Sequence, residues 1–437
     1  MQKKKAFHYA FAVAGAYCLV IPAIYLFSNP FSMYMVPIVE DLGITRGMYS
    51  LHQTVHEIIS AIAYFLYVRI QKKFGLREIA TMGLVCAALA ALCYSVAHSL
   101  PLLFLGGAFS ALIWPLSSQV TAGSIVNNWF AKKSATVISI IFGCGNIAGF
   151  FNAKIIAHWI GFYGWRRSMM NTLVVMLVVA AIAYLLIRSH PSEKGTYAWG
   201  APEGAAGLPA KTQEPDPSTL PGAVFKDSVK NLKLYSAYAW CFITGIIVYP
   251  VVGIIPAQLQ DIGFSASAVS SAVGIMSIGS LVLLIPLGQV IDRWGIRPAT
   301  VACVVSYLGM IALLLTITPA APFLATVAGF LMGAAILLFT ILPLFMKEVF
   351  GFREFAKFMS YSVIFRTIGN AIGSPLLNFV YDHVGSYRIV LLVFAAISVL
   401  LLVFGVIATS KKNPLWVETR PGYPNYAGPK QAAEQSV

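Results

Sequence analysis

Charge is scarce in this sequence. Only 11% of its 437 residues are Asp, Glu, Lys or Arg, and 58% are hydrophobic. A soluble domain carries about 25% charged residues. With a mean hydropathy of +0.78, the composition excludes a soluble fold and indicates a membrane protein.

Motifs typical of enzymes and metal sites are also missing. The sequence has no GxxxxGK[ST] loop, which argues against an ATP-driven pump. It has no HExxH, no GxSxG and no pair of carboxylates suited to catalysis. The six cysteines lie singly in apolar runs without a CxxC, so we expect neither disulfides nor a metal or other cofactor. We predict that the protein is not an enzyme.

Apolar runs of about 20 residues, long enough to cross a bilayer, occur twelve times. They lie near 9–39, 49–69, 79–98, 101–126, 134–158, 165–188, 234–260, 267–291, 298–317, 322–347, 356–381 and 387–409. A segment rich in Pro, Gly and charge divides them into six and six. We predict an all-α membrane protein with bundles over 1–190 and 233–412, a linker over 191–232 and a tail over 413–437. After Met1 no cleavable signal peptide is recognisable.

Positive charge is unevenly distributed between the loops. Of the 30 Lys and Arg residues, 24 lie in segments on the side of the N-terminus and only four in the opposite loops. Positive charge favours the cytoplasmic side, so both termini are predicted to be cytoplasmic, in an inner (plasma) membrane. The net charge of +14 then requires no nucleic-acid partner.

The two halves of the chain resemble each other at a nearly fixed spacing. Residues 27–44 match 247–264 and residues 69–77 match 289–297, both at an offset of 220. "GNIAG" at 145–149 matches "GNAIG" at 369–373 at an offset of 224. We expect two homologous six-helix bundles, related by an axis along the membrane normal, with a cavity between them.

One loop of the second half carries a family motif. "GQVIDRWGIR" (288–297) resembles the G-x-x-x-D-R-x-G-x-R loop of the major facilitator superfamily. The resemblance implies twelve helices in that fold and a gating latch formed by Gly288, Asp292, Arg293, Gly295 and Arg297. In the first-half copy, Val68 and Lys72 replace the first Gly and the Asp.

A narrower resemblance is to the oxalate/formate antiporter and monocarboxylate transporter group. It rests on "NNWFAKKSATVIS" (127–139), "GWRRSMM" (164–170) and "RSHPSEKG" (188–195). The oxalate branch implies a cation at the place of Arg366 that recognises a carboxylate. The lysine of the first span and the Asp/Arg pair of the eighth, expected in monocarboxylate transporters, are both missing.

Arg366 lies near the middle of an apolar run, where an isolated charge costs at least roughly 2.5–3.5 kcal/mol. Its repeat mate is Phe142, so the shared scaffold does not require a charge there. Arginine binds carboxylates in a bidentate manner. Arg366 therefore either holds an anionic substrate or forms a permanent ion pair with Glu57.

Glu57 is the one carboxylate within the apolar runs, and it follows His52 and His56. These three residues are candidates for proton coupling. The alternative is a buried polar cluster that stabilises one conformation. The two histidines lack a third ligand for a metal.

Other polar and aromatic residues could contact the substrate. Lys154 either reaches the outer interface or stands at the substrate mouth, and Asn370 lies one turn after Arg366. Pro30 and Pro250 are predicted to break the first and seventh spans, and they either serve in gating or are simple tolerated kinks. Further candidates for substrate contact are Asn29, Trp114, Gln119 and Tyr249.

The predicted function is secondary transport of a small organic anion, a mono- or dicarboxylate. Transport would occur by alternating access, with proton symport or anion exchange, and the lipid bilayer is the other partner. The alternative is an exporter or facilitator of a neutral or hydrophobic compound, with Arg366 paired to Glu57. A receptor, a third class, would require an attached signalling domain.

Overall fold

The computed structural model describes residues 8–201 and 222–410, and in these ranges every regular element is a helix. The centre of the predicted linker and the predicted tail lie outside the described residues. The first half contains α1 (Tyr9–Ser28), the 3₁₀ helix η1 (Asn29–Tyr34), α2 (Met35–Leu42), α3 (Arg46–Ser95), α4 (Leu100–Ser110), α5 (Ile113–Ser117), α6 (Gln119–Trp129) and α7 (Ser134–Leu186). The second half contains η2 (Pro191–Lys194), α8 (Phe225–Ser228), α9 (Leu232–Ile262), α10 (Ala266–Trp294), α11 (Ile296–Thr316), α12 (Phe323–Thr340), α13 (Leu342–Phe350), α14 (Phe355–Val384) and α15 (Arg388–Ala408).

Two of these helices are too long for one crossing. α3 has 50 residues and α7 has 53, or roughly 75–80 Å at 1.5 Å per residue, against a hydrocarbon core of about 30 Å. Each contains one glycine with a non-helical backbone, Gly75 (φ 74°, ψ 169°) and Gly164 (φ 76°, ψ 166°). This positive φ suits glycine, and the chain reverses there, so each helix supplies two arms.

By length and composition, nine of the described helical stretches are apolar enough to span a membrane, and one of them, Thr136–Leu186, contains both arms of α7. The first arm of α3 and the whole of α14 are absent from that set. These two arms carry Glu57 and Arg366. With them the crossings number twelve, as the sequence predicted, and the two most polar crossings are the ones that bear the candidate charges.

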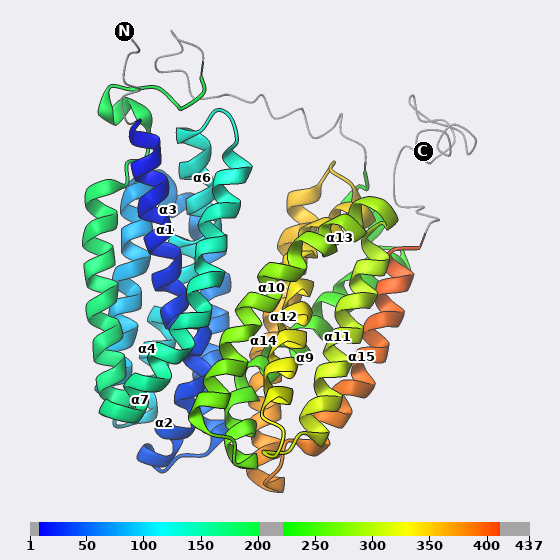
Figure 1. Cartoon of the computed structure of the whole chain (residues 1–437). Coiled ribbons are helices and arrows are strands. Elements are labelled where there is room, and N and C mark those ends of the chain that lie inside the picture. Colours follow the sequence, from blue (N-terminus) through cyan, green and yellow to red (C-terminus); the bar gives the residue numbers. More distant parts are fainter. Residues whose placement is uncertain (1–7, 202–221, 411–437) are drawn as a thin grey trace.

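The crossings form two bundles, α1–α7 and α9–α15, which stand side by side (Figure 1). We call the end that carries Tyr9 and Ala408 the terminal end, and the end that carries Gly43 and Gly263 the far end. The bundles lie close together toward the far end and diverge toward the terminal end (Figure 1). The main contacts between bundles are α3 with α14, which joins the second and eleventh spans, and α7 with α10.

The repeat is visible in the backbone. Gly75 and Gly295 lie 220 residues apart and adopt nearly the same conformation, with φ of 74° and 82°. Each lies where one crossing ends and the next begins, at the terminal end. The matched loop segments of the two halves therefore make the same turn.

The described parts of the linker pack on the bundles. Trp199 exchanges backbone hydrogen bonds with Trp129 and Ala131, and its ring contacts Phe11 and Phe130. On the other side of the linker, Ala223 donates to the Phe350 carbonyl at 2.8 Å. Each end of the linker is thus part of the bundle next to it.

Pro250 does not interrupt its helix, contrary to the prediction. α9 is continuous from Leu232 to Ile262, because a proline removes only its own hydrogen bond to the residue four before, here Ile246. α14 passes close to that carbonyl, since a Cβ added at Gly373 would lie 2.4 Å from Ile246 O. Pro30, in contrast, stands where α1 gives way to η1. The fourth crossing is broken after Ser110 and Ser117, on either side of Trp114-Pro115, where the sequence suggests a proline break. The tenth crossing contains a break at Ile341 that the sequence reading missed.

Candidate functional site

Arg366 lies in the part of α14 that faces both α9 and the other bundle. Its guanidinium carbon is 5.2 Å from the centre of the Phe339 ring, beside the break between α12 and α13. Within residues 8–201 and 222–410 the structure gives Arg366 no hydrogen bond and no ion pair within 4.0 Å. The five N–H donors of this cation therefore remain available to a ligand.

Glu57 reaches the same region from α3. Its Oε1 accepts a hydrogen bond from Asn370 Nδ2 at 3.3 Å, across the boundary between the bundles. Asn370 lies one turn after Arg366 and is 3% exposed. The structure thus brings Arg366, Asn370 and Glu57 together, but Glu57 is bound to the amide and not to the arginine.

Small residues fix this arrangement by letting α14 lie directly against α9. A Cβ at Gly369 would lie 2.3 Å from Phe242 O, and one at Gly245 would lie 2.2 Å from Arg366 O. Such distances require glycine on both helices, as in other closely packed membrane helices. The packing sets the angle at which Arg366 and Asn370 leave the helix.

The other contact between the bundles, α7 with α10, carries no charge pair. Asn29 Nδ2 donates to Ser277 Oγ at 3.0 Å, and Ser280 Oγ donates to Asn146 Oδ1 at 3.3 Å. Asn146 is the repeat mate of Asn370, and each forms a hydrogen bond to the opposite bundle. Both helix contacts between the bundles are polar, but the charged residues Glu57 and Arg366 belong to the α3–α14 contact alone.

The histidines point away from Glu57. His52 is buried, bonds the Tyr49 carbonyl and contacts the rings of Phe31 and Tyr94. His56 Nδ1 forms a 2.8 Å hydrogen bond with Ser110 Oγ on α4. Both side chains therefore lie inside the first bundle.

The remaining predicted contacts are dispersed. Tyr249 is 45% exposed and its ring lies 6.2 Å from that of Phe339. Trp114 contacts Tyr25 at 5.7 Å between ring centres. Lys154 is exposed on α7, with Nζ 4.6 Å from the Phe150 ring one turn before it. The side chain of Gln119 lies outside the described atoms.

The family motif lies at the terminal end, where Gly295 ends α10 with φ of 82°. Asp292, Arg293 and Arg297 are exposed, and a Cβ at Gly288 would meet nothing within 4 Å. A latch between bundles is thus not engaged among the described residues at this end.

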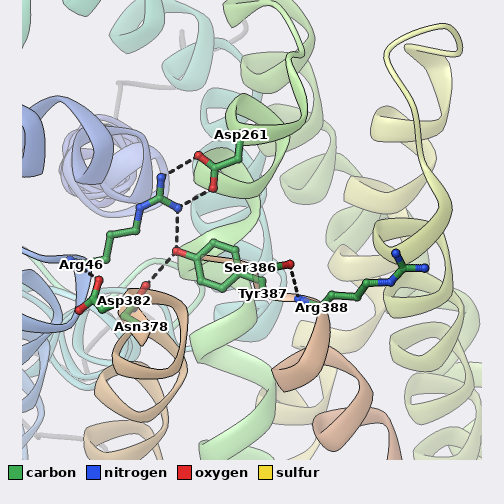
Figure 2. A network of polar contacts seen from close by, with 7 residues as sticks. All are labelled: Arg46, Asp261, Asn378, Asp382, Ser386, Tyr387 and Arg388. Carbon is green, nitrogen blue, oxygen red and sulfur yellow. Dashed lines mark hydrogen bonds and ion pairs between the residues drawn. The ribbon is translucent and has the colours of Figure 1, made fainter. Parts of the chain in front are cut away.

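A network at the far end, which the sequence reading missed, joins the bundles (Figure 2). The Arg46 guanidinium donates two hydrogen bonds of 2.7 Å to the Asp261 carboxylate and one of 3.0 Å to Tyr387 Oη. Its carbon lies 4.1 Å from the centre of the Tyr381 ring. The Tyr387 hydroxyl donates in turn to Asn378 Oδ1 at 3.0 Å.

Asp382 binds the beginning of α3. Its carboxylate accepts from the backbone N–H groups of Arg46 at 3.0 Å and Gly47 at 2.8 Å. A carboxylate is favourable at a helix N-terminus because it satisfies free N–H groups and complements the helix dipole. A Cβ at Gly47 would lie 2.3 Å from the Phe379 ring, so only glycine allows this approach.

The sequence signal for this network was the repeat match of Asp41 with Asp261. The partner of Asp261 could not be identified from the sequence, because Arg46 lies in a loop, where its charge bears only on the orientation of the chain in the membrane. Together the contacts of Arg46, Asp261 and Asp382 hold the bundles closed at the far end. The described residues show no comparable bridge between bundles at the terminal end.

The residues of the narrower resemblance have a packing role. Asn128 Nδ2 donates to the Ser189 carbonyl at 3.0 Å, and Trp129 Nε1 donates to the Arg188 carbonyl at 2.7 Å. The segments 127–139 and 188–195 therefore meet at the terminal end, where Asn128 and Trp129 bind the chain just after α7.

Comparison with known proteins places the chain in a family. The sequence matches the profile described as Major Facilitator Superfamily over residues 13–257 and 239–431. It is 26% identical over 273 residues to the sialic acid transporter NanX of Escherichia coli (strain K12). That match covers 61% of this chain and 62% of the relative, which is less than two thirds of its length.

Solved structures share the fold at low identity. The nucleoside transporter NupG matches with a TM-score of 0.69 at 14% identity, over 93% of this chain and 100% of that one. The xylose transporter XylE from E. coli matches with a TM-score of 0.62 at 13% identity, over 91% and 98%. None of these matches bears on the oxalate/formate and monocarboxylate resemblance, which stays a prediction.

Proposed function

The chain belongs to the Major Facilitator Superfamily, and from this premise we propose that it is a secondary transporter of a small carboxylate. The substrate passes between the two bundles by alternating access, and Arg366 is its main contact. The relative named for sialic acid, an acid, is consistent with an anionic substrate.

The observation that carries the proposal is the unpaired state of Arg366. A cation at membrane depth normally finds a permanent counter-charge, because its desolvation is costly. The described residues supply none within 4.0 Å, and Glu57 is bound to Asn370 instead. A carboxylate substrate would supply the missing charge and accept two parallel N–H groups.

The far-end network suggests how the cycle is gated. By the distribution of positive charge, the far end is the outer side, so this structure corresponds to a state closed outward. Opening outward requires Arg46 to leave Asp261 and Asp382 to leave the start of α3. Glu57 is the candidate coupling group, because it bridges α3 and α14 where a substrate on Arg366 would arrive.

Carboxylate binding can be tested by thermal stabilisation of the purified protein with a panel of mono- and dicarboxylates. A ligand at 100 times its Kd stabilises by roughly 2.7 kcal/mol. We expect a shift with one class of acid in the wild type and none in Arg366→Gln. Lys154→Gln, which removes the other cation at membrane depth, is the matched control and should keep the shift. A shift that survives Arg366→Gln would refute the proposal.

A second candidate is transport of an uncharged solute. NupG and XylE are named for nucleosides and xylose, which carry no carboxylate. In that case Arg366 pairs with Glu57 during part of the cycle. The double variant Arg366→Gln/Glu57→Gln would then transport normally, whereas the carboxylate proposal expects it to be inactive.

A further inference from the structure

Three aromatic side chains surround the unpaired arginine. Phe339 lies under the Arg366 guanidinium, and Tyr249 meets Phe339 edge-on with ring centres 6.2 Å apart. Tyr64 lies two turns after Glu57 on the same face of α3, and Tyr249 belongs to α9, which packs against α14. The two tyrosines therefore flank the charges from opposite bundles.

These rings are accessible although they lie within crossings. Tyr64 is 39% exposed and Tyr249 is 45% exposed. The site thus offers flat apolar faces next to a cation.

The site also contains hydrogen-bond acceptors, from Glu57 and Asn370. Glu57 presents a carboxylate, and Asn370 Oδ1 is buried without a hydrogen-bond partner while its Nδ2 is bound to Glu57. The other polar groups of the interface, Asn29 with Ser277 and Asn146 with Ser280, are bound to each other. The site therefore has a cation on one side and hydrogen-bond acceptors on the other, with the rings and hydroxyls of Tyr64 and Tyr249 near both.

We propose that the carboxylate substrate is aromatic and carries a hydroxyl donor, as in a hydroxyaryl carboxylic acid. This inference rests on the proposed function. The carboxylate binds Arg366, the ring lies among Tyr64, Tyr249 and Phe339, and the hydroxyl donates to Glu57 or Asn370 Oδ1. A donor at this place satisfies the acceptor that the protein leaves unpaired.

Other acids fit the site less well. A short aliphatic acid leaves the aromatic faces uncovered and forgoes stacking, which contributes about 2- to 10-fold in affinity per ring pair. A sugar acid would lay several hydroxyls against the aromatic faces, and each buried hydroxyl left without a partner weakens binding. Only an aromatic acid with a single hydroxyl donor matches the cation, the hydrogen-bond acceptors and the aromatic rings together.

The experiment measures Kd by titration calorimetry on the purified full chain. The probes are 3-(4-hydroxyphenyl)propionate, 3-phenylpropionate, lactate and gluconate. We expect 3-phenylpropionate to bind about 10-fold more weakly than the hydroxylated acid, because it leaves the hydrogen-bond acceptors unpaired. Lactate and gluconate are expected to bind weaker still.

Paired variants test the role of the aromatic rings. Tyr249→Phe keeps the ring and should change the Kd of the hydroxylated acid by less than about 3-fold, whereas Tyr249→Leu should raise it about 5- to 10-fold. If Tyr249→Leu does not fold, the same comparison is made with Phe339→Tyr and Phe339→Leu. Equal effects of the two substitutions in a pair would overturn the role of the ring.

The two proposals fail in different ways. If lactate or gluconate binds most tightly and this binding is lost in Arg366→Gln, the proposal of an aromatic substrate is wrong. The proposal of a carboxylate transporter is then still supported. Binding of no acid, or binding that Arg366→Gln does not weaken, overturns the proposed function itself.

Discussion

Each bundle has an aspartate at the equivalent place of the repeat at the far end. One is bound by an arginine of its own bundle and the other by an arginine of the opposite bundle. Asp41 precedes Gly43 at the end of α2, and Asp261 precedes Gly263 at the end of α9. Asp41 is bound by Arg166 of its own bundle. Asp261 is bound by Arg46, which comes from the other bundle.

The residues that follow the next far-end turn also differ. Two residues after Gly164 the first bundle has Arg166, and two residues after Gly385 the second bundle has Tyr387. Arg166 binds Asp41 of its own bundle, whereas Tyr387 binds Arg46. The Asp41 pair can persist in every arrangement of the bundles, whereas the Asp261 pair must break when they separate at the far end.

Burial adds to the contrast. The side chains of Arg166 and Asp41 are 33% and 42% exposed. In the other pair Asp261 is 31% exposed, but Arg46 is only 10% exposed. Exposed ion pairs contribute little to stability, but removing one partner of a buried pair leaves an uncompensated charge. We infer that the Asp41–Arg166 pair mainly supports the fold of its own bundle. The Asp261–Arg46 pair mainly sets the equilibrium between conformations.

The largest effect is expected from Arg46→Gln. The substitution leaves Asp261 without its cation, while the backbone N–H groups that bind Asp382 remain. It should cost the far-end-closed state about 2 kcal/mol, roughly 30-fold in the equilibrium. The far-end distance can be measured by electron–electron resonance between spin labels at Ser99 and Ala320, exposed loop positions in opposite bundles, after replacing the six native cysteines. An unchanged distance distribution would show that the network does not gate.

Gly47→Ala should have a smaller effect in the same direction. The new methyl group would lie 2.3 Å from the Phe379 ring and 2.6 Å from Asp382 Oδ2, so α14 must move away from the start of α3. Overpacking of this kind costs about 1–3 kcal/mol, and part of it should appear as far-end opening between the same labels. Gly161→Ala, where a Cβ meets nothing within 4 Å, is the control. Equal distances in the two variants would contradict the close approach.

The smallest effect is expected from Arg166→Gln. It removes an exposed pair within one bundle, so the free energy of unfolding should fall by less than about 1 kcal/mol. The label distance should stay that of the wild type. A far-end opening as large as that of Arg46→Gln would remove the distinction between the two aspartates.

Much of the fold could be predicted because it follows from composition along the chain. Apolar runs must span the bilayer as helices, since no other open structure satisfies its backbone there. The repeat then predicted two bundles. The predicted interruption at Pro250 was wrong, and the break at Ile341 was not predicted, because tertiary packing decides where a helix bends.

The site could be predicted only in part. Arg366 and Glu57 stand out in any apolar sequence, since ionisable groups there are costly and usually functional. The partner of Glu57 was not predictable, because Asn370 comes within 3.3 Å of it only through the way α14 packs on α9 and α3. The inward orientation of His52 and His56 likewise depends on which face of α3 meets α4.

By itself, the sequence determined the twelve crossings, the two homologous halves and the presence of single charges at membrane depth. These properties are local, because they depend on hydrophobicity and on residue identity at each position. Only the tertiary structure decided that Arg366 has no counter-charge within reach and that Arg46 crosses between bundles to Asp261. Those facts depend on distances between residues more than 200 positions apart, which are set by how the two bundles meet.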